Sequence, residues 1–213
     1  MIRRWLRTIR EPRGRRGHRG RRQRGQSLVE LSVALPMFFM FMIIPIELGF
    51  MYLHYVGLEY ATRAGARVGA GLASGAQNAL TWPTACATVD AQIIASVERT
   101  LVDRGSLVLM DQITSIKIYK AIANGTPDLT KTNTWTYTGP NTGPTVDGRR
   151  LSFTGPQTVA WNACNRVNGA TPDALGVAIA YTYRLASPLD RMYGVFGSET
   201  ILMSDRTVMA LNP

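Results

Sequence analysis

The sequence predicts an α+β fold: a long N-terminal transmembrane helix extended into a helical stalk, then a small extracytoplasmic domain with one amphipathic helix on an antiparallel sheet. Three observations lead to this prediction. An arginine-rich leader precedes a membrane-length apolar run, apolar residues recur every four positions from residue 88, and period-two alternation follows nearer the C-terminus. We therefore divide the chain into a basic cytoplasmic leader (residues 1–25), a transmembrane helix (26–53), a helical stalk (54–73) and an extracytoplasmic domain (74–213).

The positive charge of the chain is concentrated in the leader. Residues 1–25 hold eleven arginines and one acid, Glu11, so they account for the whole formal charge of +10. The remainder is neutral, with 13 basic and 13 acidic side chains. A chain that is basic throughout would indicate a nucleic-acid partner, whereas a basic segment before an apolar helix indicates a cytoplasmic end. We expect no nucleic acid as a partner, although arginines alone could bind one.

Residues 28–53 form an apolar run that contains no Lys or Arg. As a helix it would be about 39 Å long, which exceeds a hydrocarbon core of roughly 30 Å. Glu30 and Glu47 leave 16 uncharged residues between them, so we expect Glu30 at the inner edge of the membrane and Glu47 at the outer edge. The run predicts a single pass through the inner membrane, in contact with lipids, with the C-terminal domain outside.

Two other interpretations of this run remain open. A removable Sec signal peptide usually has an apolar core of only about 7–15 residues and ends near a small-x-small site. An uncleaved signal anchor has the same topology as a processed helix, so topology does not exclude it.

Glu30 is the residue that separates these interpretations. A carboxylate in the middle of a bilayer costs about 3 kcal/mol on insertion scales, and less at the edge. If the chain is cut between Gly25 and Gln26, the new amine and the Glu30 carboxylate lie at i and i+4 on one helix face. In an assembly, the carboxylate could also meet the amine of a neighbour. The alternative is a hydrated glutamate that complements the helix dipole.

The N-terminal residues resemble a type IV prepilin processing pattern and, more closely, TadE-like pseudopilins of the tight-adherence (Tad/Flp) pilus system. The similar segments are Arg24-Gly25, Val29-Glu30, Leu35-Pro36, Glu47-x-Gly49, Ala61 to Arg67 and, more weakly, Asp205 to Pro213. Leu31 departs from the pattern, since many relatives carry an aromatic residue there, and residues 74–176 fall outside the resemblance.

This resemblance implies a precursor cut after Gly25 by a prepilin peptidase, with methylation of the new Gln26 amine. It implies that Glu30 acts in assembly with other pilins or pseudopilins and the assembly platform. A chain much longer than a single-helix pilin fits a minor or initiating subunit, in the membrane or in a surface pilus. The alternative from the residues alone is a signal-anchored extracytoplasmic binding module unrelated to pili.

Small residues recur every fourth position beyond the membrane run. The set is Gly57, Ala61, Gly65, Gly69 and Ala73. A glycine inside a helix costs about 1 kcal/mol against alanine, so the stripe indicates close packing against another element. Both a partner within this chain and a partner in another subunit fit the stripe, and a loosely helical stalk without a partner is the remaining alternative.

The extracytoplasmic domain contains one clear helical pattern and three alternating segments. Residues 88–104 predict a helix that ends at Gly105. Residues 116–120, 177–184 and 201–211 predict strands. Residues 124–176 are rich in Gly, Pro, Thr and Asn, which indicates turn-dense sheet or ordered loop, and Asp147-Gly148 could close a hairpin.

Two cysteines, Cys86 and Cys164, fall on the side expected to be oxidising, which predicts a disulfide between them; two unrelated buried thiols are the alternative. His54 is the only histidine after the leader, so we expect no metal site and no cofactor. No catalytic motif occurs, and Glu98, Asp103 and Asp111 read as ordinary surface charges. We therefore expect no enzyme, with a hydrolase using paired carboxylates as the remaining enzymatic alternative.

Overall fold

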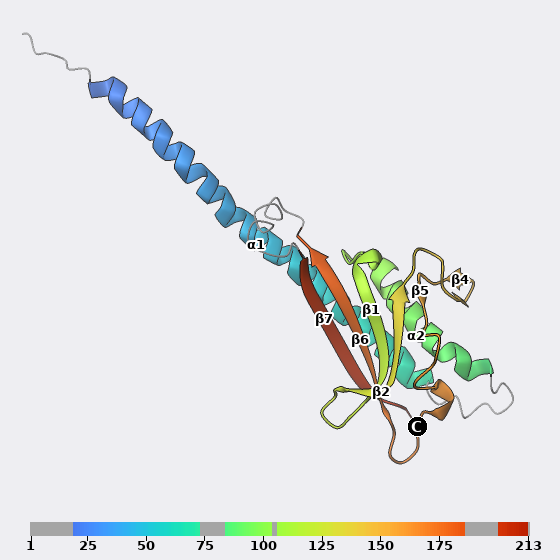
Figure 1. The fold of residues 1–213 in the computed structure, drawn as a ribbon. Coiled ribbons are helices and arrows are strands. Elements are labelled where there is room, and N and C mark those ends of the chain that lie inside the picture. Colours follow the sequence, from blue (N-terminus) through green and yellow to red (C-terminus); the bar gives the residue numbers. More distant parts are fainter. Residues whose placement is uncertain (1–18, 73–83, 104–105, 186–199, 213) are drawn as a thin grey trace, which may run out of the picture. The chain divides into compact units, whose positions relative to one another are not determined.

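The computed structural model describes residues 19–72, 84–103, 106–185 and 200–212. The chain divides into two compact units, Met1–Pro45 and Ile46–Pro213. Helix α1 (Arg19–Leu72) begins in the first unit and ends in the second (Figure 1). Ala73, Arg104 and Gly105, which the sequence analysis assigned to helices or their ends, lie outside the described residues.

The described part of the first unit, residues 19–45 of α1, begins with basic residues and continues as the apolar run. Its side chains from Leu28 to Ile44 are mostly exposed, large aliphatic and aromatic groups included. Among the described residues, Gly25–Leu72 is one helix long and apolar enough to cross a membrane. Pro36 and Pro45 both lie within α1, and Pro45 is the last residue of the first unit. An interior proline removes a helical hydrogen bond, so the unit boundary coincides with a local weakness in the helix ladder.

The second unit is built on a five-stranded sheet in the order β5-β2-β1-β6-β7, in which every neighbouring pair is antiparallel (Figure 1). The strands are β1 (Ile113–Ala121), β2 (Pro127–Tyr137), β5 (Phe153–Thr154), β6 (Ala174–Arg184) and β7 (Thr200–Ala210). A separate hairpin pairs β3 (Thr145–Val146) with β4 (Arg149–Arg150), and two short 3-10 helices, η2 (Met110–Gln112) and η3 (Ala163–Asn165), lie in the connections.

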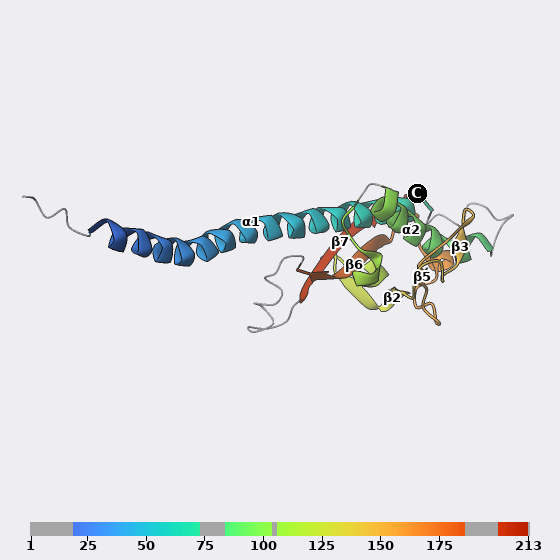
Figure 2. The same ribbon diagram turned by 90° about the horizontal axis from the view of Figure 1, so that it is seen from above.

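Helix α2 (Thr84–Asp103) and the second half of α1 lie against the same face of this sheet (Figure 2). The core between them is apolar because alternate residues of β6 point inward, as period two requires. These are Leu175, Val177, Ile179, Tyr181 and Tyr183, all buried. The predicted α+β architecture is therefore confirmed, with α2 as the amphipathic helix on the sheet.

The alternating segments of the sequence correspond to β1, β6 and β7, so these three strand predictions are confirmed. The hairpin prediction is also confirmed, since Asp147 (φ 48°) and Gly148 (φ 76°) form the turn between β3 and β4. Both central residues have the positive φ that a type I′ turn needs.

Strand β2 was not predicted as a single strand. Its inward side chains include the buried polar Asn133 beside Trp135, while threonines and Lys131 occupy much of the rest. A strand with so few apolar residues lacks the alternation in hydropathy that identifies strands in sequence. Its threonines are β-branched and favour extended backbone, and this composition was the one feature of the sequence that could have indicated a strand.

Gly65 of α1 lies where the helix touches both α2 and the sheet. A Cβ atom at this position would lie 2.7 Å from Val97 Cγ2 and 3.5 Å from Val177 Cγ1. Valine methyl groups on a branched Cβ have little freedom to move. The absence of a side chain therefore sets the distance between α1, α2 and β6.

Replacing Gly65 by leucine is expected to lower the free energy of unfolding by about 1–3 kcal/mol, because the extra carbons overpack this junction. Gly71 is the matched control: it lies in the same helix and has nothing within 4 Å of a Cβ position. Gly71→Leu should leave stability unchanged or slightly raised. Thermal unfolding of the full-length chain in detergent, followed by circular dichroism, measures both. Equal effects at the two positions would contradict this account of the junction.

Candidate assembly site

The segment expected to be processed lies within α1. The helix begins at Arg19, so the Gly25–Gln26 peptide bond is inside it. Gln26 Nε2 donates a hydrogen bond to Glu30 Oε1 at 3.0 Å, and both side chains are exposed. The two residues therefore share one helix face, as an i to i+4 spacing requires. The side-chain amide at position 26 therefore reaches this carboxylate.

Gly25 has no neighbour that explains the absence of its side chain. Nothing lies within 4 Å of a Cβ position at Gly25, and the same holds for Gly49. A glycine inside a helix costs about 1 kcal/mol, and within the described residues no close contact at Gly25 offsets that cost. Gly25 therefore makes the helix easier to unwind at this peptide bond.

The second half of α1 carries a buried acid. Glu47 is 7 % exposed, and one of its oxygens, Oε1, accepts a hydrogen bond of 2.6 Å from the Tyr183 hydroxyl of β6. Burial and then the hydrogen bond to Glu47 raise the pKa of Tyr183 above its usual range. The phenol therefore stays protonated and remains a donor to the carboxylate at neutral pH.

About two helical turns further on, His54 extends this contact with β6. Its ring centroid lies 5.0 Å from that of Tyr183 and 5.8 Å from that of Tyr181. Tyr181 in turn donates a hydrogen bond to Gln112 Oε1 at 2.6 Å. An acid, an imidazole and two phenols thus join α1 to β6 and η2 at one end of the sheet.

A second polar contact ties α1 to the edge strand β7. The Thr62 hydroxyl donates to Asp205 and lies 3.1 Å from the hydroxyl of Thr207, and Thr62 is fully buried. A buried hydroxyl without a partner would be costly, so this pairing specifies which face of α1 meets β7.

The small residues of α1 lie along the faces that meet the rest of the second unit. A Cβ atom at Gly57 would come 2.7 Å from Ser106 Oγ, and one at Gly69 would come 2.9 Å from Leu175 Cδ2. Ala61 is fully buried. Together with Gly65, these positions touch α2, β6 and the segment before η2, so the partner of the stripe includes elements of this chain's own domain.

Cys86 of α2 and Cys164 of η3 are joined in a disulfide, with their Cα atoms 5.2 Å apart. The same connection is held by Asp90 of α2, which accepts from Arg166 Nη2 at 2.5 Å and from Asn133 Nδ2 at 2.7 Å. The guanidinium of Arg166 also lies 4.4 Å from the centre of the Trp161 ring, within cation–π range. The disulfide thus reinforces a polar network that holds the η3 segment against α2.

Glu98 is not the surface charge that the sequence analysis expected. It is 1 % exposed, its Oε1 accepts from the Ser152 amide at 2.8 Å, and its Oε2 has no hydrogen-bond partner among the described residues. Burial raises the pKa of this carboxyl above its usual range, while the Ser152 amide and Arg149 oppose that rise. The helical spacing already contained the signal, because position 98 is four residues from the buried Ile94.

Asp103 and Asp111 are the other two acids that the sequence analysis expected at the surface. Asp111 is exposed, as expected, and the side chain of Asp103 lies outside the described residues. Among the described part of the chain, no group of three or more His, Cys, Asp or Glu side chains could hold a metal ion.

A comparison with family models finds that the model described as TadE-like protein matches residues 25–67. The match confirms the resemblance to TadE-like proteins over the segment in which it was strongest. It spans α1 from Gly25 to Arg67 and leaves the rest of the domain outside. No curated protein and no solved structure matches this chain.

The buried carboxyl of Glu98 leads to a pH dependence of stability. The folded chain holds this proton more tightly than the unfolded chain does, so the stabilising effect is complete below the ordinary pKa of 4.5. It is lost as the pH rises through the higher pKa of the folded state. Glu98→Gln removes the ionisation, so the variant should gain stability relative to the parent chain as the pH rises above 4.5. Denaturant unfolding between pH 4 and pH 8 measures the difference, and a pH-independent difference would contradict the assignment.

Proposed function

We propose that this chain is a minor pilin or pseudopilin subunit of a Tad/Flp-type pilus or of its assembly machinery. It is made as a precursor, and a prepilin peptidase cuts it after Gly25. The arginine-rich residues 1–25 stay in the cytoplasm, residues 26–53 anchor the chain in the inner membrane, and the domain from residue 74 onward lies outside, beyond the 54–73 stalk. The mature protein begins with Gln26, whose amine is methylated.

The observation that carries this proposal is that the two halves of α1 differ in their contacts, within the segment that the family model matches. Up to Pro45 the helix exposes apolar side chains, and from Ile46 onward small residues pack it into a folded domain. A subunit that moves from a bilayer into a filament needs an apolar helix that other subunits can contact. It also needs a domain that stays folded during the transfer, and the second half of α1 belongs to such a domain.

The geometry around Glu30 supports a role in assembly. Because Gln26 and Glu30 share a helix face, cleavage would place a positive amine beside the carboxylate or offer that carboxylate to the amine of a neighbouring subunit. Opposite charges in a low-dielectric environment attract far more strongly than in water. The partners on this proposal are the prepilin peptidase, other pilins or pseudopilins and the assembly platform, and the chain itself needs no cofactor and catalyses no reaction.

Replacing Gly25 by leucine should block processing, because a peptidase that accepts glycine before the cut must exclude a bulky side chain. Gly49→Leu is the matched control, since both glycines lie in α1 with open space around them. The mass and N-terminal sequence of the protein purified from its membrane provide the readout. The parent and Gly49→Leu chains should begin at Gln26, and Gly25→Leu should retain Met1. A parent chain that begins at Met1 would overturn the processing step and favour a signal-anchored binding module.

Replacing Glu30 by glutamine should leave processing intact and reduce pilus production at least about tenfold, the change that follows from loss of about 1.4 kcal/mol of charge-pair energy. Glu59→Gln is the control, because Glu59 is a second acid of α1, paired with Arg63 within the helix. Such surface pairs contribute little. Sheared surface pili are quantified by immunoblotting against total protein. Equal pilus yields from the two variants would contradict the role assigned to Glu30.

A further inference from the structure

The membrane run is short when it is measured between its two acids. Sixteen uncharged residues separate Glu30 from Glu47, and at about 1.5 Å per residue they span about 24 Å. A hydrocarbon core of roughly 30 Å requires about four residues more. The additional residues come from beyond one or both of the two acids.

The structure indicates that the residues after Glu47 can supply this additional membrane length. The carboxylate of Glu47 is buried against Tyr183, so it does not face the surroundings of the helix. The next residues expose apolar side chains, namely Leu48, Phe50, Tyr52 and Leu53. Tyrosine side chains such as Tyr52 are enriched where a membrane helix meets the headgroups. The outer boundary of the hydrocarbon therefore falls at about residues 50–53.

The domain carries further exposed apolar side chains beside the part of α1 between Glu47 and Gly57. We call them the basal rim: Leu107, Leu109, Ile201 and Leu202. Ser106 and Val108 touch the Gly57 position, which places Leu107 and Leu109 beside α1. Ile201 pairs in the sheet with Tyr183, whose hydroxyl binds Glu47. Leu109 is 54 % exposed and Leu202 is 82 % exposed.

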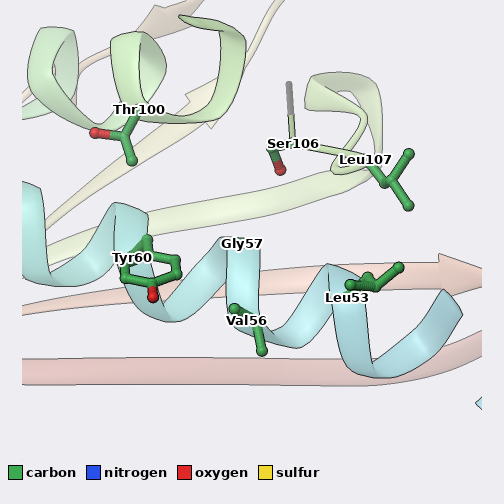
Figure 3. A pocket seen from close by; sticks show the side chains of 7 residues that line it. All are labelled: Leu53, Val56, Gly57, Tyr60, Thr100, Ser106 and Leu107. Carbon is green, nitrogen blue, oxygen red and sulfur yellow. The ribbon is translucent and has the colours of Figure 1, made fainter. Parts of the chain in front are cut away.

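An open hollow of about 270 Å³ adds to this apolar surface. Leu53 of α1 and Leu107 of the rim lie at one end of it, and Tyr60 and Thr100 lie at the other (Figure 3). Arg184 and Asp111 are exposed at the same end of the sheet, since Arg184 pairs with Thr200 beside the Tyr183–Ile201 pair and Asp111 lies in η2, directly before β1. The arginine suits anionic lipid headgroups, and the aspartate requires contact with water, so this surface fits the interface and not the hydrocarbon.

We infer that the basal rim is seated in the headgroup region of the bilayer, so that the domain rests directly on the membrane before assembly. Lipid covers Leu107, Leu109, Ile201 and Leu202 in this state, and extraction of the subunit from the membrane exposes them. This inference rests on the proposed anchoring of α1 in the membrane.

Environment-sensitive labels on the full-length chain test the contact. Single cysteines replace Leu109, Leu202, Leu129 and Phe39 and are labelled with a nitrobenzoxadiazole dye without reductant, so that the Cys86–Cys164 disulfide persists. The chains are reconstituted at low density in vesicles of phosphatidylcholine and phosphatidylglycerol, with and without doxyl-labelled lipid. Leu129 is the matched control, because it is 87 % exposed at the start of β2, and β2 begins beside the opposite end of β1. Phe39 reports on the membrane anchor itself.

The expected result is blue-shifted emission and quenching by doxyl lipid at positions 109 and 202, several-fold stronger than at position 129. Quenching at position 39 alone would overturn the inference and leave the anchor intact. Blue shifts at 109 and 202 that depend on protein density, without quenching by lipid, would assign the rim to contact between subunits and would also overturn it. Absence of quenching at position 39 would overturn the anchor, and the inference with it.

Discussion

Close packing of α1 against β6 is the contact on which the domain depends. At Gly65 and Gly69 no side chain separates the helix from its neighbours: Leu175 of β6 lies 2.9 Å from a Cβ position at Gly69, and Val177 lies 3.5 Å from one at Gly65. At the other end of this contact, the Tyr183 hydroxyl holds the buried Glu47 carboxylate. Small residues permit the approach, and the polar pair specifies the rotation of the helix.

The two halves of α1 therefore have different surroundings, because only the half from Ile46 onward packs into the domain. Side chains from Leu31 to Ile44 are mostly apolar and exposed, and those after Pro45 are sorted by face into buried and exposed sets. In lipid, an apolar residue is suitable at any position around the helix axis. In the folded domain, apolar residues are suitable only on the face that packs against the core. The same distinction explains why an acid is tolerated at position 47: a protein donor satisfies it.

Part of the fold could be predicted because local patterns carry it. Residues 88–104 repeat at the helical period and lie almost wholly in α2, and the turn at Asp147-Gly148 depends on two positive φ angles that this dipeptide adopts readily. Strand β2 was not predicted from the sequence because the polar residue Asn133 occupies an inward position, which breaks the alternation in hydropathy. The buried side-chain amide of Asn133 makes four hydrogen bonds, with Asp90, with Trp161 (two) and with the Ala160 amide. All of these partners lie far away in sequence.

The sequence by itself determined the membrane-length helix, its oddly placed acids, the amphipathic α2 and the alternating strands, since each depends on residues within a few turns or positions of one another. Tertiary structure decided which element receives the small face of α1, why Glu47 and Glu98 are buried, and how Arg166 meets Asp90. These outcomes depend on contacts between residues dozens of positions apart, and a buried charge or amide is tolerated only after a distant partner or the surrounding fold has been brought to it.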